Sequence, residues 1–450
     1  MTAQGSPGPA WLRNLPAFLR RHLESRPAVQ AVLANSGWLM AEKVLRMIFG
    51  VLVGAWVARY LGPQQFGALA YVLAFVAFFQ ALSLLGLEGL TVREIAQGPA
   101  RAGAVLGTVF RLRLGASGLG LFLACGLAWA LRPGDADTLL LVAIVAAGML
   151  LQSAEVIDLW FQSQTQSRRA VLARAAAFLL ASAARVALVL AAAPLWAFAA
   201  VQLLDTGLAA LLLARAYRRF PTRDAWIWSP TAARALLTQS WPFLLSALAV
   251  ITYMRIDQIM LRELAGEREV GIYSAALPFS QAFHFLPVVV CASLLPVLSR
   301  LHAEDRGRFY ARLQQLFTIF AWSAIALVVA LALASHWLVA LLLGAAYEQS
   351  ARVLALHAVT NVFVFLGVAQ SQWILIEHRS LIALARTLAG AAANVFANLM
   401  LIPRYGALGA AAAAVIAQAV AAVLSNLVLA PQLFRMQVRA FVAPAFRAAP

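Results

Sequence analysis

Apolar residues fill long runs of this chain, and charged residues are confined mostly to the short segments between the runs. A helix of about 20 apolar residues crosses the ~30 Å hydrocarbon core of a bilayer. Because a segment in lipid must satisfy its own backbone hydrogen bonds, each run is expected to be a helix. We predict twelve membrane spans. They cover residues 35–59, 66–88, 104–131, 138–160, 170–193, 195–214, 236–261, 270–297, 313–343, 352–376, 380–402 and 407–430.

Composition strengthens this assignment to the all-α polytopic membrane proteins. Hydrophobic residues make up 63% of the 450 residues, charged residues make up 12%, and the mean hydropathy is +0.82. Soluble domains contain only ~45–50% apolar residues. Cys125 and Cys291 both lie inside predicted spans, so neither a disulfide framework nor a metal site is expected. No cofactor is expected either.

The net charge of +17 comes almost wholly from arginine, since Lys43 is the only lysine. A basic chain can bind nucleic acid or anionic lipid, but here the arginines lie mainly in alternate connections between spans. Such a bias orients a membrane protein with its basic loops inside. We therefore expect membrane lipids and no nucleic acid around the chain. Both termini are expected in the cytoplasm, with a basic segment over residues 1–34 and a soluble tail over 431–450.

The chain also contains an internal duplication. A cytoplasmic linker, residues 215–235, separates six spans in residues 35–214 from six in residues 236–430. Gly62 and Gly67, in the loop after span one, recur as Gly266 and Gly271 after span seven. Six helices between copies give the repeats the same orientation, so they are related by an axis along the membrane normal. Two such lobes around a central cavity form a transporter architecture.

Several segments carry a family resemblance. They are Ala58–Gly67 (ARYLGPQQFG), Gly86–Ala96, Arg255–Leu261 with Glu269–Ala276, and Asn398–Ala411. Together they resemble Wzx-type polysaccharide transporters of the multidrug/oligosaccharidyl-lipid/polysaccharide (MOP) exporter superfamily, over residues 35–429. The resemblance implies a MATE-like fold of twelve helices in two six-helix lobes around a V-shaped cavity, working by alternating access.

The same resemblance implies a function. The expected cargo is an undecaprenyl-diphosphate-linked oligosaccharide, moved across the bacterial inner membrane for O-antigen, capsule or exopolysaccharide synthesis. A polysaccharide polymerase and a chain-length regulator are expected partners of a monomer. The energy is expected from the membrane potential, from a coupled cation (H⁺ or Na⁺), or from both.

Other function classes stay open at this stage. A multidrug antiporter or a peptidoglycan lipid-precursor flippase would share the fold. A membrane glycosyltransferase or polymerase would need catalytic groups, but the chain has neither a phosphate-binding G-x-x-x-x-G-K-[ST] loop nor a His-Glu-x-x-His pair. A transporter is therefore favoured over an enzyme, and we assign no catalytic residue.

Ionisable residues inside spans are the candidate functional groups, because a charge at a helix centre costs ~2.5–3.5 kcal/mol on insertion scales. Glu42 and Arg46 are four residues apart on one helix face and can pair. We expect Arg46 to bind phosphate in the cavity, with Glu42 orienting it. Arg255 and Asp257 are two residues apart in span seven and point to different sides of the helix. We expect Arg255 to face the cavity, where an arginine fork can form bidentate bonds with phosphate. A neutralised structural pair and ordinary helix packing are the alternatives.

The remaining candidates bind sugar or change conformation. Arg386, Asn394 and Asn398 fall on one stripe of span eleven, where amides can hydrogen-bond sugar hydroxyls or another helix. For gating or ion coupling, the candidates are Asp257, Arg59 and Pro287. Pro278, Pro287 and Pro296 are expected to bend span eight, since each removes a backbone hydrogen bond. Span nine is long enough for a break near Ser335–His336.

Overall fold

The computed structural model describes residues 27–220 and 225–442, and throughout these ranges the secondary structure is helical. The helices, in chain order, are α2 (Pro27–Leu84), α3 (Glu88–Gln97), α4 (Ala102–Leu131), α5 (Ala136–Gln152), α6 (Val156–Ser163), α7 (Ser167–Leu190), α8 (Leu195–Arg218), α9 (Pro230–Ala265), α10 (Glu267–Gln281), α11 (Phe285–Glu304), α12 (Arg306–Leu342), α13 (Glu348–Ala358), α14 (Thr360–Ile376), α15 (Ser380–Ala419), α16 (Asn426–Leu429) and α17 (Pro431–Val442).

Ten helical stretches in the described residues are long and apolar enough to cross a membrane. Two of them, the first and the last, contain a non-helical glycine at which two helices meet: Gly62 in α2 and Gly406 in α15. Each glycine has a positive φ, a conformation that a side chain would oppose. With these two reversals the chain makes the twelve passes of the predicted fold, and the protein is a multi-pass membrane protein.

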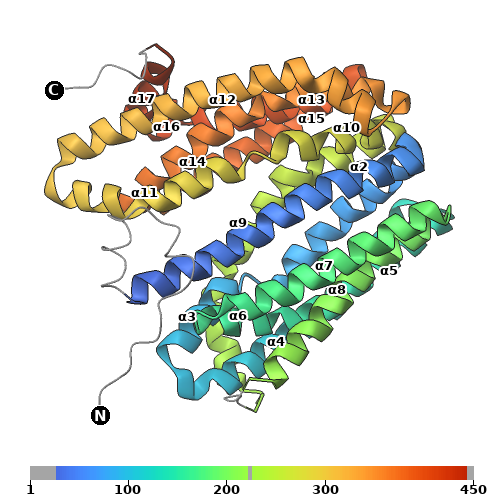
Figure 1. Ribbon diagram of the computed structural model, residues 1–450, viewed down its shortest axis with the longest axis horizontal. Helices are drawn as coiled ribbons and strands as arrows, with labels where there is room; N and C mark the ends of the chain where they lie inside the picture. Colours follow the sequence, from blue (N-terminus) through green and yellow to red (C-terminus); the bar gives the residue numbers. More distant parts are fainter. Residues whose placement is uncertain (1–26, 221–224, 443–450) are drawn as a thin grey trace.

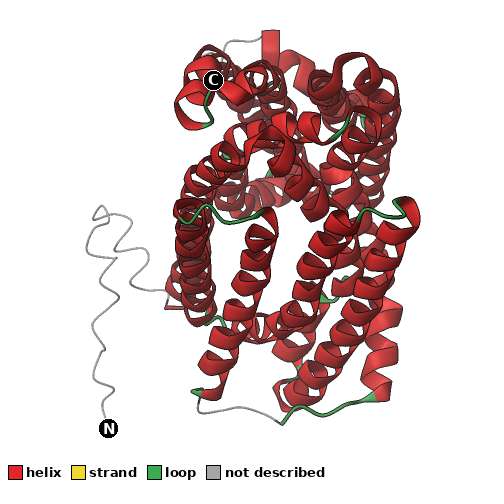
Figure 2. Cartoon of the chain, turned by 90° about the vertical axis from the view of Figure 1, so that its right-hand side faces the viewer, coloured by secondary structure: helices red, strands yellow, loops and turns green. Residues whose placement is uncertain are grey.

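The passes form two lobes that meet at one end (Figure 1). The N-lobe contains α2 to α8 and the C-lobe contains α9 to α16. At the end where the lobes meet, one hydrophobic core takes buried residues from both, including Ala58 and Tyr71 from the N-lobe and Leu261 and Tyr347 from the C-lobe. We call this the sealed end. Figure 2 shows the same all-helical body from the side.

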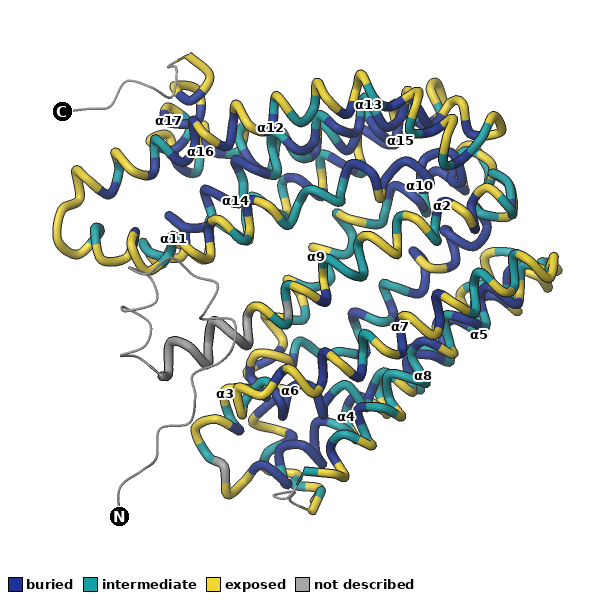
Figure 3. The backbone as a smooth tube through the Cα atoms, in the orientation of Figure 1, coloured by how far each residue is buried: buried dark blue, intermediate teal, exposed yellow. Residues whose placement is uncertain are grey.

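At the opposite end, which carries both ends of the described chain, each lobe has a core of its own. One core joins residues of α3, α4, α6, α7 and α8 with Leu236 of α9. The other joins residues of α11, α12, α14 and α17. We call this the divergent end. Buried segments accordingly concentrate within the lobes and at the sealed end, as Figure 3 shows.

The duplication is visible in the backbone itself. Gly62 (φ 70°, ψ 170°) and Gly266 (φ 91°, ψ 170°) adopt nearly the same conformation at equivalent turns. A Cβ built on Gly67 would lie 1.8 Å from the Glu267 carbonyl oxygen, and one built on Gly271 would lie 1.9 Å from the Pro63 carbonyl oxygen. These contacts are reciprocal, as expected for two parallel repeats related by a pseudo-two-fold axis. The sequence duplication therefore marks one point where the lobes touch.

Several sequence predictions need correction. The ninth span is the unbroken helix α12, so the break predicted near Ser335–His336 is absent. The segment after residue 430 is not a simple soluble tail, because Pro431–Val442 forms α17 and buries Leu433, Met436 and Ala440 against the C-lobe.

One prediction about helix shape is confirmed. The bend predicted for span eight is present, since α10 ends at Gln281 and α11 begins at Phe285. Residues 1–26 of the expected basic segment, 1–34, lie outside the described ranges.

Candidate functional site

The N-lobe candidates form a cluster of ion pairs on α2. Glu42 is buried and accepts from Arg46 Nε at 3.1 Å, so the predicted pair forms. Arg174 of α7 binds the same carboxylate with two hydrogen bonds of 3.0 and 2.7 Å and also pairs with Asp158 of α6. Because Arg174 neutralises Glu42 in a bidentate geometry, Arg46 keeps part of its charge available. Its guanidinium also lies 4.9 Å from the centre of the Phe178 ring.

A polar cavity of about 540 Å³ adjoins this cluster inside the N-lobe, lined by Glu88, Arg113, Glu155, Asp158 and Arg174 among others. Arg113 is almost fully buried, and none of its three guanidinium nitrogens has a hydrogen-bond partner. Its nearest acid, Glu88, is 3.9 Å away. Arg113 lies near the start of the predicted span 104–131, where an arginine side chain can extend to the membrane surface. Burial by α3 and α6, which are distant in sequence, could not be foreseen.

Arg255 and Asp257 on α9 have different environments. Asp257 is buried within the C-lobe and accepts hydrogen bonds from Tyr273 Oη at 2.8 Å and from Asn398 Nδ2 at 2.7 Å. No basic side chain pairs with it among the described residues. Arg255 is half-buried, and its one hydrogen bond runs to Gln258 at 3.5 Å. An unpaired guanidinium at this depth is costly without a ligand or water.

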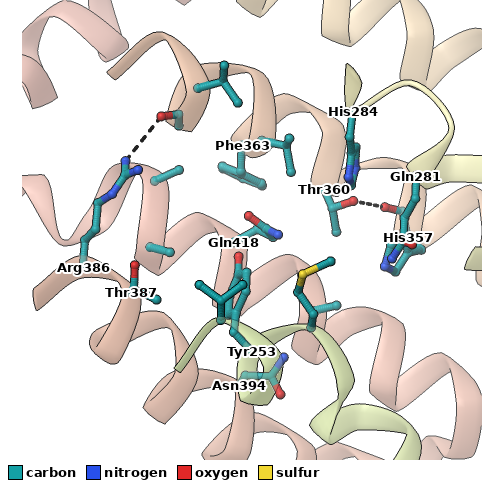
Figure 4. Close-up of a pocket in the computed structure, with 18 of the residues that line it drawn as sticks. Tyr253, Gln281, His284, His357, Thr360, Phe363, Arg386, Thr387, Asn394 and Gln418 are labelled. Atoms are coloured by element: carbon teal, nitrogen blue, oxygen red, sulfur yellow. Dashed lines mark hydrogen bonds between the residues drawn. The ribbon is translucent and has the colours of Figure 1, made fainter. Parts of the chain in front are cut away.

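Arg386 and Asn394 line a second cavity, of about 320 Å³, inside the C-lobe (Figure 4). Helices α9, α10, α13, α14 and α15 contribute to its wall. Arg386 makes two long hydrogen bonds, 3.4 Å to the Gly367 carbonyl and 3.5 Å to Ser371 Oγ, and no carboxylate pairs with it in the described chain. Asn398 lies outside this cavity, in the buried cluster with Asp257, and donates to Asn394 Oδ1 at 2.6 Å.

The sealed end holds a polar group that sequence reasoning missed. Arg262, at the end of α9, is almost fully buried and reaches across to the N-lobe, where its Nη2 contacts Asp135 Oδ2 at 3.3 Å and Thr138 Oγ1 at 2.8 Å. It also pairs with Glu267 at 2.7 Å and lies 4.1 Å from the Tyr71 ring centre. The sequence placed Arg262 in a short outer loop and showed no partner for it.

The electrostatic environment of this seal favours the charged form of the Asp135 carboxylate. Burial raises the pKa of Asp135, but hydrogen bonds from Thr138 and the charges of Arg262 and Arg132 outweigh it, so the pKa lies below its ordinary value. Arg132 also forms an ion pair across the lobes, 3.1 Å from Glu263. The seal is thus a polar network around the backbone contact of the two repeats.

The two other gating candidates, Arg59 and Pro287, lie in different parts of the molecule. Arg59 is exposed at the sealed end and donates across the lobes to the Leu341 carbonyl at 3.4 Å. Pro287 is buried near the start of α11, just after the bend of the eighth pass. Their roles in gating stay predictions. No hydrogen bond or ion pair in the described chain links Arg46, Arg255 and Arg386, so the predicted binding residues do not form one preassembled site.

Residues 32–302, which form more than half of the chain, match a protein family described as "Polysaccharide biosynthesis protein". The chain belongs to the polysaccharide biosynthesis protein family. Curated individual proteins give no significant match. The family match confirms the resemblance seen in the sequence.

Solved structures share the fold of this family member. It is similar to the lipid II flippase MurJ in an inward closed conformation, with a TM-score of 0.71, 11% identity and 91% of each chain covered. It is also similar to an inward-facing MATE family multidrug resistance transporter of the MOP superfamily (TM-score 0.69, 18% identity, 88% of this chain and 96% of that one). An outward-facing MATE family multidrug resistance transporter of the MOP superfamily is similar with a TM-score of 0.58, at 17% identity, over 91% of this chain and 96% of that one.

These likenesses confirm the predicted twelve-helix MOP fold. Together with the family match, they support a transporter of the flippase type. The candidate functional groups of this polysaccharide biosynthesis protein therefore lie on two lobes that share one hydrophobic core at the sealed end, while the first part of α9 also packs on the N-lobe near the divergent end.

Proposed function

We propose that the protein moves an undecaprenyl-diphosphate-linked oligosaccharide from the cytoplasmic to the periplasmic leaflet of the bacterial inner membrane by alternating access. The proposal rests chiefly on one observation: this two-lobed family member carries two intramembrane arginines that the described chain does not fully neutralise, since Arg255 has no acid partner and Arg46 shares Glu42 with Arg174. An anionic diphosphate needs such cations, and the prenyl tail can stay in lipid beside an open cleft.

The orientation follows from charge. The divergent end carries the ends of the described chain and connections with clusters such as Arg300, Arg306, Arg308 and Arg312. By the positive-inside rule this end faces the cytoplasm. The structure then represents the state that accepts cargo from the inner leaflet. Its higher similarity to an inward-facing than to an outward-facing transporter supports the same assignment.

Cargo class is argued from the sign of the available charges. A multidrug antiporter for cationic drugs needs exposed carboxylates in the cleft. Here Glu42 and Asp158 are occupied by Arg174, and Asp257 is buried under two hydrogen bonds. Arg255, in contrast, has no acid partner among the described residues, which favours an anionic cargo. We retain the polymerase, the chain-length regulator and the monomeric state as predictions.

The test measures flipping in proteoliposomes, with the lipid-linked oligosaccharide extracted from the producing bacterium as cargo. A hydrogen bond to a charged group contributes about 1.5–3 kcal/mol, so Arg46→Ala and Arg255→Ala should each lower the rate about 10- to 100-fold. Arg308→Ala, which removes a well-exposed arginine at the divergent end, is the control. Wild-type rates in both the Arg46 and the Arg255 variant, at normal protein levels, would remove these arginines as phosphate ligands.

We also propose that Asp257 couples flipping to H⁺ or Na⁺. Its carboxylate has two donors but no cation, and Asn398 Oδ1 beside it is buried without a partner. Asp257→Asn keeps the size and should abolish acceleration by an imposed pH or Na⁺ gradient. Rates that respond to either gradient equally in wild type and variant would exclude this residue. Rates that respond only to voltage would favour direct drive by the membrane potential.

A further inference from the structure

The C-lobe cavity contains polar groups that the protein itself does not satisfy. Tyr253 Oη and His284 Nε2 are buried there without a hydrogen-bond partner. Gln281 and Gln418 line the same cavity, and neither amide forms a hydrogen bond within the described ranges. Figure 4 shows Gln418 near the middle of this group, with Tyr253 beside it and His284 and Gln281 on the side away from Arg386.

Such an arrangement is unfavourable in an empty cavity. A buried donor or acceptor without a partner costs about 1–3 kcal/mol. Two such buried atoms, with the two unbonded glutamine amides beside them, surround one space of about 320 Å³ and favour an occupant with hydroxyl or amide groups. The volume is at the lower end of the range typical of small-molecule sites, about 300–1,000 Å³.

The charge of the wall selects against a phosphate group. Arg386 and Asp257 are the formally charged residues among those that line the cavity, apart from histidine, and their charges cancel. Asp257 would also repel an anion. A diphosphate therefore belongs near the other arginines, while this cavity suits an uncharged group.

Its surface is also that of a site for a hydroxylated ring. Hydroxyl, amide and imidazole groups can each donate or accept, which matches the alternating donors and acceptors of sugar hydroxyls. Phe363 and Tyr253 supply aromatic surface for the apolar face of a ring. The lining includes Val250 and Met254, exposed residues on α9, so the space is not closed off on that side.

We propose that the C-lobe cavity is a saccharide subsite, which binds an uncharged sugar ring of the cargo and helps to select the glycan. This inference rests on the proposed flippase function and adds to it a place where the head group is recognised. It assigns to Tyr253 and Gln418 the role of specificity residues. Asn394, at the cavity wall, then links the sugar to the Asp257 cluster through Asn398.

The experiment compares the binding of two lipids to the purified full-length protein in nanodiscs. One is the lipid-linked oligosaccharide extracted from the producing bacterium, and the other is undecaprenyl diphosphate without sugar. The variants are Tyr253→Phe and Gln418→Leu, which remove a hydroxyl and an amide that lack protein partners. Tyr405→Phe, an exposed tyrosine, is the matched control.

Each cavity variant should bind the glycosylated lipid about fivefold more weakly, as expected for one lost hydrogen bond, and the bare lipid as wild type does. Thermal stability should be unchanged or higher, because the removed groups have no partner in the protein. Equal affinities of wild type and variants for both lipids, or equal losses for both, would overturn the subsite. If wild type binds neither lipid, the proposed function fails and the subsite fails with it.

Discussion

The substitution Gly271→Ala should separate the two lobes at the sealed end. The new Cβ would lie 1.9 Å from the Pro63 carbonyl oxygen and 2.7 Å from its carbonyl carbon. Non-bonded carbon and oxygen atoms normally approach to about 3.3 Å. Both colliding groups are held by backbone, so no rotamer change can relieve the overlap. The two helix turns must therefore separate by more than about 1 Å.

The magnitude follows from the cost of overpacking. Extra methyl groups in a well-packed contact cost typically about 1–3 kcal/mol, and an overlap this large belongs at the upper end. A loss of about 2–3 kcal/mol shifts the balance between sealed and separated states about 30- to 150-fold. Because the contact is reciprocal, Gly67→Ala should have a similar effect, with its Cβ 1.8 Å from the Glu267 carbonyl oxygen.

Distances between spin labels would measure this shift in nanodiscs. Cysteines replace Asp137 on α5 and Glu348 on α13, both exposed at the sealed end, after Cys125 and Cys291 are changed to Ala. The glycine variants should populate a longer distance than the parent protein. Gly118→Ala is the control, since its Cβ would meet nothing within 4 Å. If all variants share the parent's distance distribution, the glycine contact does not hold the lobes together.

Two further predictions concern the polar seal. Arg262→Met should destabilise the sealed state by about 2 kcal/mol, because it removes charge-assisted hydrogen bonds and a cation–π contact; the same labels report it. Arg268→Met, at an exposed arginine, should have little effect, and equal effects of the two substitutions would contradict the role of Arg262 in holding the lobes together. Asp135 has a lowered pKa, so its contribution to stability is complete above the ordinary value of 3.8 and is lost as pH falls through the lower native pKa. Melting temperatures of Asp135→Asn should therefore change less than those of wild type between about pH 6 and about pH 3; parallel curves would exclude Asp135.

The sequence by itself determined the class and the path of the chain. Twelve apolar runs predict twelve passes because lipid admits a spanning segment only as a self-satisfied helix. Gly62 and Gly266 were recognisable as equivalent turns, and the pairing of Glu42 with Arg46 followed from their spacing on one helix. All these features depend on residues near each other in the chain or on a solvent that leaves few alternatives.

Only the tertiary structure decided which polar groups meet. Arg174 joins Glu42 from 132 residues away, Asn398 joins Asp257 from 141, and Arg262 reaches Asp135 from 127. Nothing local specifies such partners, because each results from the packing of several helices. For the same reason the sequence could not show that Arg113 is buried, that the C-lobe encloses a polar cavity, or that the repeated glycines touch across the two lobes.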